Sequence, residues 1–548
     1  MTVLPARILM MVVLMVAALV SACDDTNAGS VIVADGPDNV QDINNAAGPA
    51  DNDNVEEPNH GLDGPDDINN GAQEPEDDVP VPNDDINNGP GPDDDEPLQP
   101  QGPVPELGLG EHDWWIHAGY DQRSSIKGLL ATHPDGHSAV LVQHDVGLTV
   151  ESPQDSLRVP PGRFSLVGFD AEGRTTRDTP VALPTFPRRD DYGAVAIDST
   201  HNFVVVTGIV SGSFSADGTS IELPGGQPSM VIMHFSPDGG LNWYDIFPIE
   251  RSGHCEHIAV SSADRVAIAC DIDRQMMLAV YEPDGTPVFK KTYGGIGHNG
   301  INSPVNALAW HADALLAVQG VTNRPFEGDI DAEPIDVQGG QDVFAAVYGA
   351  NDGQHIWSTL IGGGSDSSND FPEAGAGIVF DAAGNVYISG QVVGNVRLGG
   401  DLIEAEYRSV PTAFLASWEP QSGALRWVEV GPEYSSGGPV AWDAERGISW
   451  VNTTGVPTPG TLSDRQIHTQ IDYFSVQDGL KRATVPLGER LVGSNYQTHF
   501  DGSGFLYTTT RLNDVIPQDS ALVNELELNL QEGRNDLIER FSLPILVP

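Results

Sequence analysis

Two cysteines near position 260 are the first residues whose type and spacing could do chemistry. Cys255 and Cys270 flank a predicted hairpin turn centred on Ser262 and Ala263. Their equal spacing about the turn places them opposite each other on an antiparallel strand pair. Opposite cysteines have a Cα separation that suits a disulfide, and disulfides persist in exported proteins. The sequence therefore predicts a Cys255–Cys270 disulfide.

The same segment offers an alternative, a metal site. His254, Cys255, His257 and Cys270 supply two imidazoles and two thiols, a ligand set that suits tetrahedral zinc. However, adjacent residues of a strand point to opposite faces, so His254 and Cys255 would not readily serve one ion. The spacing favours the disulfide over zinc, and no metal ligand is assigned.

A second motif lies in a predicted turn from residue 236 to residue 243. Ser236, Asp238, Gly240 and Trp243 fit the Asp-box pattern, S-x-D-x-G-x-x-W, which resembles the turn that sialidase-like propellers carry between their third and fourth strands. In that resemblance the Ser and Asp side chains bond the backbone, and the Trp packs between repeats. The motif predicts a structural turn without a catalytic role.

Catalytic motifs are otherwise missing from the sequence. Five histidines lie in or near the first repeat, namely His112, His117, His133, His137 and His144. Their spacing follows no metal-ligand motif, so we interpret them as surface residues. The chain contains no Gly-x-Ser-x-Gly elbow, phosphate loop or His-Glu-x-x-His motif. We therefore predict no catalytic residue and no cofactor.

The first 23 residues indicate export. Arg7 precedes an apolar run of 13 residues, Ile8 to Val20, which is short for a membrane span and normal for a signal peptide. The following Val-Ser-Ala-Cys resembles the bacterial lipobox, which implies that residues 1–22 are a lipoprotein signal peptide and that Cys23 is lipidated. The alternative is ordinary cleavage after Ala22. Two or more acyl chains on Cys23 would anchor the protein stably to a membrane.

We interpret residues 23–110 as a linker between this anchor and the rest of the chain. From residue 24 to residue 110 there are 23 acidic residues and no Lys or Arg. The segment is dominated by Asp, Asn, Pro and Gly, so it cannot bury enough apolar surface to offset chain entropy. We expect it to be disordered. Calcium binding by its oxygen-rich side chains is an alternative, but the loop spacing of a calcium site is missing.

The overall charge excludes one class of partner. The chain has 26 Lys+Arg and 79 Asp+Glu, for a formal net charge of −53. The electrostatic field of so large a negative charge repels nucleic acid rather than binding it. The 61 glycines and 41 prolines favour a protein with many turns and an all-β fold.

Residues 111–548 contain a repeat that would position the motifs above. An acidic or small residue followed by Gly recurs after short β-like runs, at Gly173, Gly239, Gly285, Gly353, Gly423, Gly479 and Gly533. An aromatic residue follows several of these turns, namely Trp243, Phe289, Trp357 and Trp427. A second predicted turn precedes each one, which indicates two hairpins and four strands per repeat. About seven such repeats predict an all-β fold, a seven-bladed β-propeller.

The repeat resembles a known family. Residues 378–390, the strand 413–418, the Ser422-Gly423 turn and Trp427 are similar to the bacterial SBBP-type β-propeller repeat of exported proteins. The repeats at 196–247 and 306–363 are similar too. The resemblance implies a propeller and export, and it implies no catalytic residues. A weaker likeness to quinoprotein-like propellers, including an outer-membrane assembly lipoprotein, supplies no reason to assign a quinone.

Two strands compete to close the ring. Residues 114–119 resemble the fourth strands at Trp243, Trp357 and Trp427, whereas residues 537–543 could also be a fourth strand. The sequence leaves both open.

The predicted function is that of a non-enzymatic binding or scaffolding module. We expect a monomer, lipid-anchored at the bacterial cell envelope and at the outer membrane or cell surface rather than the inner membrane, with a protein or glycan partner. The alternatives are a polysaccharide hydrolase or lyase on a propeller scaffold, and a periplasmic envelope-assembly factor.

Overall fold

A computed structural model describes most of the predicted propeller region. The described residues are 112–120, 125–143, 148–152, 154–159, 164–176, 181–182, 193–209, 212–250, 253–273, 275–293, 305–322, 342–362, 374–394, 396–398, 401–403, 411–457, 465–487, 497–500, 505–511 and 534–544. The predicted signal peptide (1–22), the lipidation site Cys23 and the linker to residue 110, with its calcium alternative, lie outside them. Within the described residues, no helix is both long and apolar enough to span a membrane.

The first three sheets, in chain order, have four strands each. Sheet 1 contains β2 (Ser125–Thr132), β3 (Ser138–Gln143), β6 (Phe164–Phe169) and β7 (Val181–Ala182). Sheet 2 contains β8 (Ala194–Ile197), β9 (Phe203–Ile209), β12 (Ser229–Phe235) and β13 (Leu241–Pro248). Sheet 3 contains β14 (Gly253–Val260), β15 (Val266–Ile272), β16 (Gln275–Tyr281) and β17 (Pro287–Tyr293). Consecutive strands in each sheet pair antiparallel.

Three more four-stranded sheets follow. Sheet 4 contains β18 (Val305–His311), β19 (Leu315–Thr322), β20 (Asp342–Gly349) and β21 (His355–Ile361). Sheet 5 contains β22 (Ala374–Phe380), β23 (Val386–Val393), β26 (Pro411–Trp418) and β27 (Leu425–Glu433). Sheet 6 contains β28 (Ser435–Asp443), β29 (Gly447–Pro457), β30 (Arg465–Phe474) and β31 (Lys481–Pro486).

The last sheet, sheet 7, is assembled from both ends of the described chain. Its strand order is β32 (Gln497–Phe500), β33 (Phe505–Arg511), β34 (Arg534–Ser542), β1 (His112–Tyr120), β4 (Leu148–Glu151) and β5 (Ser156–Val159). Two separate hairpins, β10 (Ser213–Ala216) with β11 (Thr219–Glu222) and β24 (Val396–Leu398) with β25 (Asp401–Ile403), are inserted in sheets 2 and 5. The short 3-10 helix η1 (Pro224–Gly226) is the helical element of the described residues.

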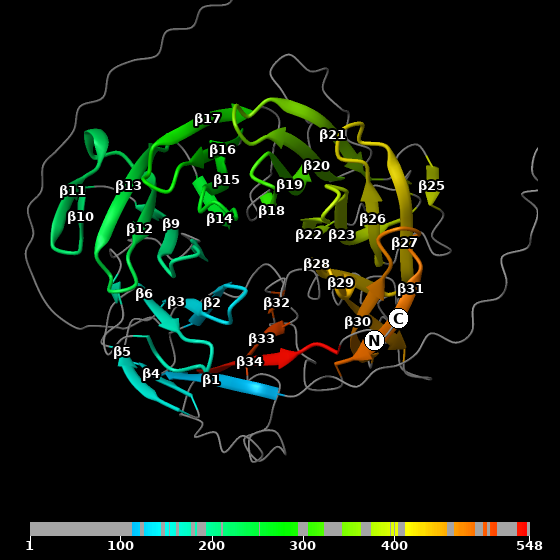
Figure 1. The fold of residues 1–548 in the computed structure, drawn as a ribbon, viewed down its shortest axis with the longest axis horizontal. Helices are drawn as coiled ribbons and strands as arrows, with labels where there is room; N and C mark the ends of the chain where they lie inside the picture. Colours follow the sequence, from blue (N-terminus) through cyan, green and yellow to red (C-terminus); the bar gives the residue numbers. More distant parts are fainter. Residues whose placement is uncertain are drawn as a thin grey trace, which may run out of the picture. The chain divides into compact units, whose positions relative to one another are not determined.

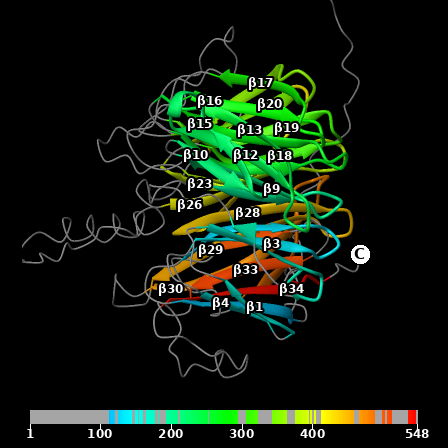
Figure 2. The same cartoon turned by 90° about the vertical axis from the view of Figure 1, so that its left-hand side faces the viewer.

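The sheets form a closed ring around a common centre (Figure 1). The first strand of each sheet contacts the first strand of the next, in the order β2, β8, β14, β18, β22, β28 and β32, and β32 contacts β2. Figure 2 shows the strands running roughly along the axis of this ring. The predicted all-β, propeller-like architecture is confirmed.

The strand that completes sheet 7 beside β34 is β1. It pairs antiparallel with β34, with Ala118 opposite Asp536 and Gly119 opposite Asn535. Residues 537–543 therefore belong largely to the third strand of the sheet, and the N-terminal strand takes the fourth position. The β4–β5 hairpin, inserted between β3 and β6 of sheet 1, then pairs with the other edge of β1. The chain therefore passes between sheets 1 and 7 three times, from β1 to β2, from β3 to β4 and from β5 to β6.

The turn glycines of the repeat have a shared structural reason. Gly285, Gly353, Gly423 and Gly479 all have positive φ, between 64° and 84°. A Cβ at these positions would lie 2.5–2.8 Å from an aromatic side chain of the preceding sheet, in the order Trp243, Phe289, Trp357 and Trp427. Each fourth-strand aromatic residue therefore packs onto the turn glycine of the next sheet. Glycine satisfies both the backbone conformation and the close approach.

Strands in the middle of sheets 2 and 4 are buried on both faces because each of these sheets packs between two neighbours. All residues of β12 are buried, as are seven of the eight residues of β20. One core cluster combines Val347 and Trp357 of sheet 4 with Phe380 and Trp418 of sheet 5. The apolar runs that look continuous in the sequence are thus the double-sided interior of a stack of sheets.

Candidate functional site

The Asp-box-like turn joins β12 to β13. The Ser236 hydroxyl bonds the Asp238 carboxylate and donates to the Gly240 carbonyl at 3.1 Å. The Ser236 backbone N–H donates to the same carbonyl at 2.8 Å. Trp243 packs on Gly285, and its indole N–H donates to the Pro283 carbonyl of sheet 3 at 3.0 Å. These contacts stabilise the turn and connect sheets 2 and 3, so the motif has a structural role.

Cys255 and Cys270 are joined by a disulfide between β14 and β15, with 4.2 Å between their Cα atoms. Both side chains are completely buried. The strand register shifts between His254 and His257, so the cysteines lie at a β-bulge and the hairpin is less regular than simple symmetry about the turn predicts. With both sulfurs in the disulfide, the zinc alternative at this hairpin has no thiolate ligands.

The disulfide makes a chemical prediction. Unfolding the protein in denaturant with an alkylating reagent, without reduction, should leave Cys255 and Cys270 unmodified, because neither sulfur is a free thiol. Prior reduction should add two alkyl groups. Peptide mass spectrometry reads out both results. Alkylation of both residues without reduction would show that the purified protein lacks the bond.

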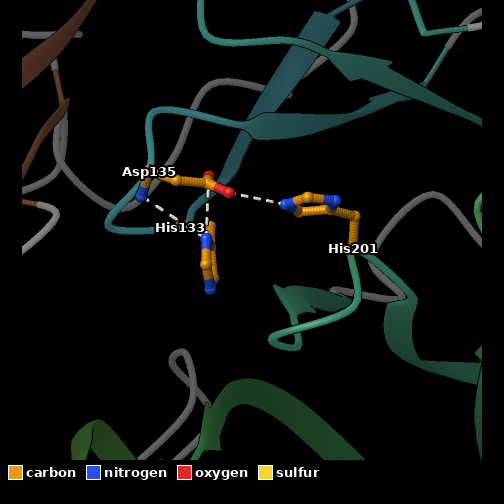
Figure 3. A group of neighbouring side chains, drawn as sticks. All are labelled: His133, Asp135 and His201. Atoms are coloured by element: carbon orange, nitrogen blue, oxygen red, sulfur yellow. Dashed lines mark hydrogen bonds and ion pairs between the residues drawn. The ribbon is translucent and has the colours of Figure 1, made fainter.

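Four side chains from two turns converge where sheets 1 and 2 meet. His133, Asp135 and His137 lie in the β2–β3 turn, and His201 lies in the β8–β9 turn. Nδ1 of His133 lies 2.8 Å and Nδ1 of His137 lies 2.9 Å from Oδ1 of Asp135. Nε2 of His201 lies 2.7 Å from Oδ2 of the same carboxylate. Figure 3 shows the carboxylate between His133 and His201.

Ring contacts fix the orientation of these imidazoles. The His137 and His201 rings stack with centroids 3.8 Å apart, and the His133 ring meets His201 edge-on at 5.4 Å. The His133, Asp135 and His201 side chains are 21%, 43% and 34% exposed. The cluster is therefore ordered by its own contacts and also open to solvent.

The cluster favours an ionised carboxylate. Burial by itself would raise the pKa of Asp135, but hydrogen bonds from His133, His201 and His137 outweigh it and hold that pKa well below its ordinary value. Asp198, at the first position of the β8–β9 turn, behaves in the same way. Its pKa is lowered because hydrogen bonds from His234, Asn202 and Thr200 outweigh the effect of burial.

The corresponding turns of other sheets are joined more simply. Ser199 of sheet 2 donates to Asp264 of sheet 3, from its backbone N–H at 2.8 Å and from its hydroxyl at 2.6 Å. The Ser262 hydroxyl donates to Asp313 of sheet 4 at 3.0 Å. A serine and an aspartate therefore suffice to connect adjacent turns. The contact between sheets 1 and 2 differs because imidazoles surround the carboxylate.

Sequence reasoning missed this convergence. It treated His133 and His137 as surface residues and did not single out Asp135 or His201. The available signal was positional: His133 and His201 fall in the same turn of two neighbouring repeats, and such turns lie side by side in a ring. Of the other histidines of the first repeat, His112 and His117 lie in β1, and His144 lies outside the described residues.

Comparisons with known proteins do not assign a family. No family model matches the chain, and no curated protein matches it. A quinohemoprotein alcohol dehydrogenase from Comamonas testosteroni is similar in structure with a TM-score of 0.39 and 11% identity, covering 80% of this chain and 77% of that one. A protein from Lactobacillus plantarum has a TM-score of 0.36 at 11% identity and covers 69% of this chain and 97% of its own. A Synechocystis apocarotenoid oxygenase mutant has a TM-score of 0.31 at 10% identity, with 71% and 94% covered.

Proposed function

We propose that this chain is an exported, lipid-anchored, seven-bladed β-propeller that acts as a non-enzymatic binding or scaffolding module at the bacterial cell envelope. In this proposal the seven sheets are the blades, Cys23 carries the anchor, and the acidic segment to residue 110 holds the propeller away from the membrane. The partner is a protein or a glycan.

The observation that carries the proposal is the bonding between every pair of adjacent sheets. Trp243 donates to Pro283, Trp357 to Pro420 and Arg265 to Ala350, at 2.9–3.0 Å. Arginines make the equivalent bonds later in the ring, from Arg426 to Val476, Arg446 to Leu543 and Arg540 to Ala171. His201 and Asp135 connect sheets 1 and 2. A ring braced in this way is a rigid platform that can display loops for recognition without rebuilding its core.

Two further features support the envelope location. A buried disulfide is typical of proteins that fold in an oxidising compartment. A flexible linker of this length would have an end-to-end distance of roughly 50 Å, enough to lift a propeller clear of a lipid surface. Both features suit a module that meets its partner outside the cytoplasm.

Protease treatment of intact cells tests the location. We expect added protease to release the propeller by cutting within residues 24–110, because a segment with the disorder that the sequence predicts is cleaved more readily than a folded ring. Immunoblotting of the medium and the cell pellet measures the release. Protection until the outer membrane is breached would instead support the periplasmic assembly factor, and recovery of the chain in the cytoplasm would overturn export.

The matched variant for this experiment is Cys23→Ala. It removes the thiol that would carry the lipid and leaves the propeller unchanged. We expect the variant to move from the membrane fraction to the soluble fraction. Unchanged membrane association of Cys23→Ala would contradict the lipid anchor without contradicting the propeller.

A further inference from the structure

We propose that His133, Asp135 and His201 bind a divalent transition metal ion of the zinc class between sheets 1 and 2. Each residue offers one ligand atom, and these atoms all lie within 4.8 Å of one another (Figure 3). Two imidazole nitrogens and one carboxylate oxygen form a ligand set that suits zinc and its neighbours rather than calcium or magnesium, which prefer oxygen alone.

The distances are close to those that coordination requires. In a tetrahedral site with zinc bonds of about 2.0–2.1 Å, the ligand atoms lie ~3.3 Å apart. The two imidazole nitrogens now lie 2.7 and 2.8 Å from the carboxylate oxygens. Small side-chain rotations would open these contacts to admit an ion. The partial exposure of the three side chains gives an ion a route in.

The imidazoles around Asp135 distinguish this pair of turns from the others. In the equivalent turns of sheets 2, 5 and 6, the first position is an aspartate that accepts hydrogen bonds from backbone N–H groups, at Asp198, Asp381 and Asp443. In sheets 1 and 4 that position is a histidine, His133 and His311. His201 has a φ of 62°, and Asp264 at the equivalent position of sheet 3 has a φ of 61°. The turns therefore share one backbone conformation, and the side chains set the cluster apart.

The turn that carries His133 and Asp135 is held in place by contacts with sheet 7. Gly136 has a φ of 96°, and a Cβ there would lie 2.9 Å from the Arg540 guanidinium and 3.0 Å from Ala171. Arg540 is itself bonded to the Ala171 carbonyl at 2.7 Å. The His133 and Asp135 backbones are therefore positioned by sheets 1 and 7, and a metal bound to His201 as well would fasten sheet 2 to them.

Metal titration of the full-length protein in detergent, after chelator treatment, tests the site with zinc and with cobalt(II). We expect one tight equivalent per chain and cobalt absorption bands intense enough for four-coordinate geometry. Both His133→Gln and His201→Gln should weaken binding by at least about 10-fold. The matched control is His468→Gln, which changes an exposed histidine of β30 away from the cluster and should bind as the parent does.

A thermal readout separates binding from folding. The metal should raise the melting temperature of the parent and of His468→Gln by a few degrees, and should leave that of His133→Gln and His201→Gln unchanged. Melting of the metal-free variants shows that each one folds, and either of the two cluster variants suffices. Parent-like binding by both cluster variants, or no tight equivalent in the parent, would overturn the proposal.

Discussion

Replacing Ala118 with proline should lower and broaden the thermal unfolding transition of the ring. Ala118 lies in β1 with Asp536 of β34 on one side and Val150 of β4 on the other. Because both sides are paired, its N–H faces a neighbouring strand whichever way it points. Proline removes that donor and places a ring against the partner, so a ladder hydrogen bond is lost in the middle of the sheet. The loss falls on the strand that pairs with β34 and completes sheet 7 from the N-terminal side of the described residues.

The matched control is Ala118→Ser, which keeps the backbone N–H and nearly the same side-chain size. Thermal unfolding followed by circular dichroism should show a broadened, lower transition for Ala118→Pro and a parent-like one for Ala118→Ser. Amide hydrogen exchange should speed up first in β34 and β4, the neighbours of β1. Identical unfolding of the two variants would contradict closure of the ring by β1.

Gly423→Ala should lower the free energy of unfolding by about 2–5 kcal/mol, the sum of a left-handed backbone cost and an overpacking cost. Gly423 has a φ of 65°, and its new Cβ would lie 2.8 Å from Cδ2 of Trp357. The indole cannot easily move away, because it is buried and its N–H donates to Pro420 of the same turn at 2.9 Å. Chemical denaturation measures the loss.

The control for this substitution is Gly226→Ala. Gly226 has nearly the same φ, 66°, but a Cβ there would meet nothing within 4 Å. It should therefore cost only the backbone part, about 1–2 kcal/mol. The difference between the two variants measures packing of the Trp357 ring on the next sheet. Equal losses would show that this packing does not contribute, and that turn conformation alone requires the glycine.

The turn–aromatic repeat was predictable because each part of it is local. A glycine with positive φ and an aromatic residue a few positions later lie within one hairpin, so their spacing is visible in the chain. What the spacing could not show is that Trp357 packs on Gly423, the glycine of the next repeat, rather than on Gly353, the glycine of its own turn. That partner depends on how sheets stack, which involves residues more than 60 positions apart.

For the disulfide, too, one feature was predictable from the sequence and another was not. Placement of Cys255 opposite Cys270 followed from hairpin symmetry, whereas the β-bulge between His254 and His257 had no local signal. The Asp-box-like turn at Ser236 was recognisable from its pattern, since side-chain-to-backbone bonds in a turn are set by neighbouring residues. The predictions for Cys23 and the linker concern residues that the structure does not describe, and they stay predictions.

The sequence by itself determined that residues from about 111 onward form repeated antiparallel hairpins, because turn chemistry and strand alternation act over a few residues. Tertiary structure alone decided that residues 537–543 belong largely to the third strand of sheet 7, β34, and that β1 takes the fourth position beside it, a pairing of strands more than 400 residues apart. It also brought His201 to Asp135, 66 positions away. Both depend on closing the ring, since only a closed ring places the first sheet beside the last and one turn beside the next.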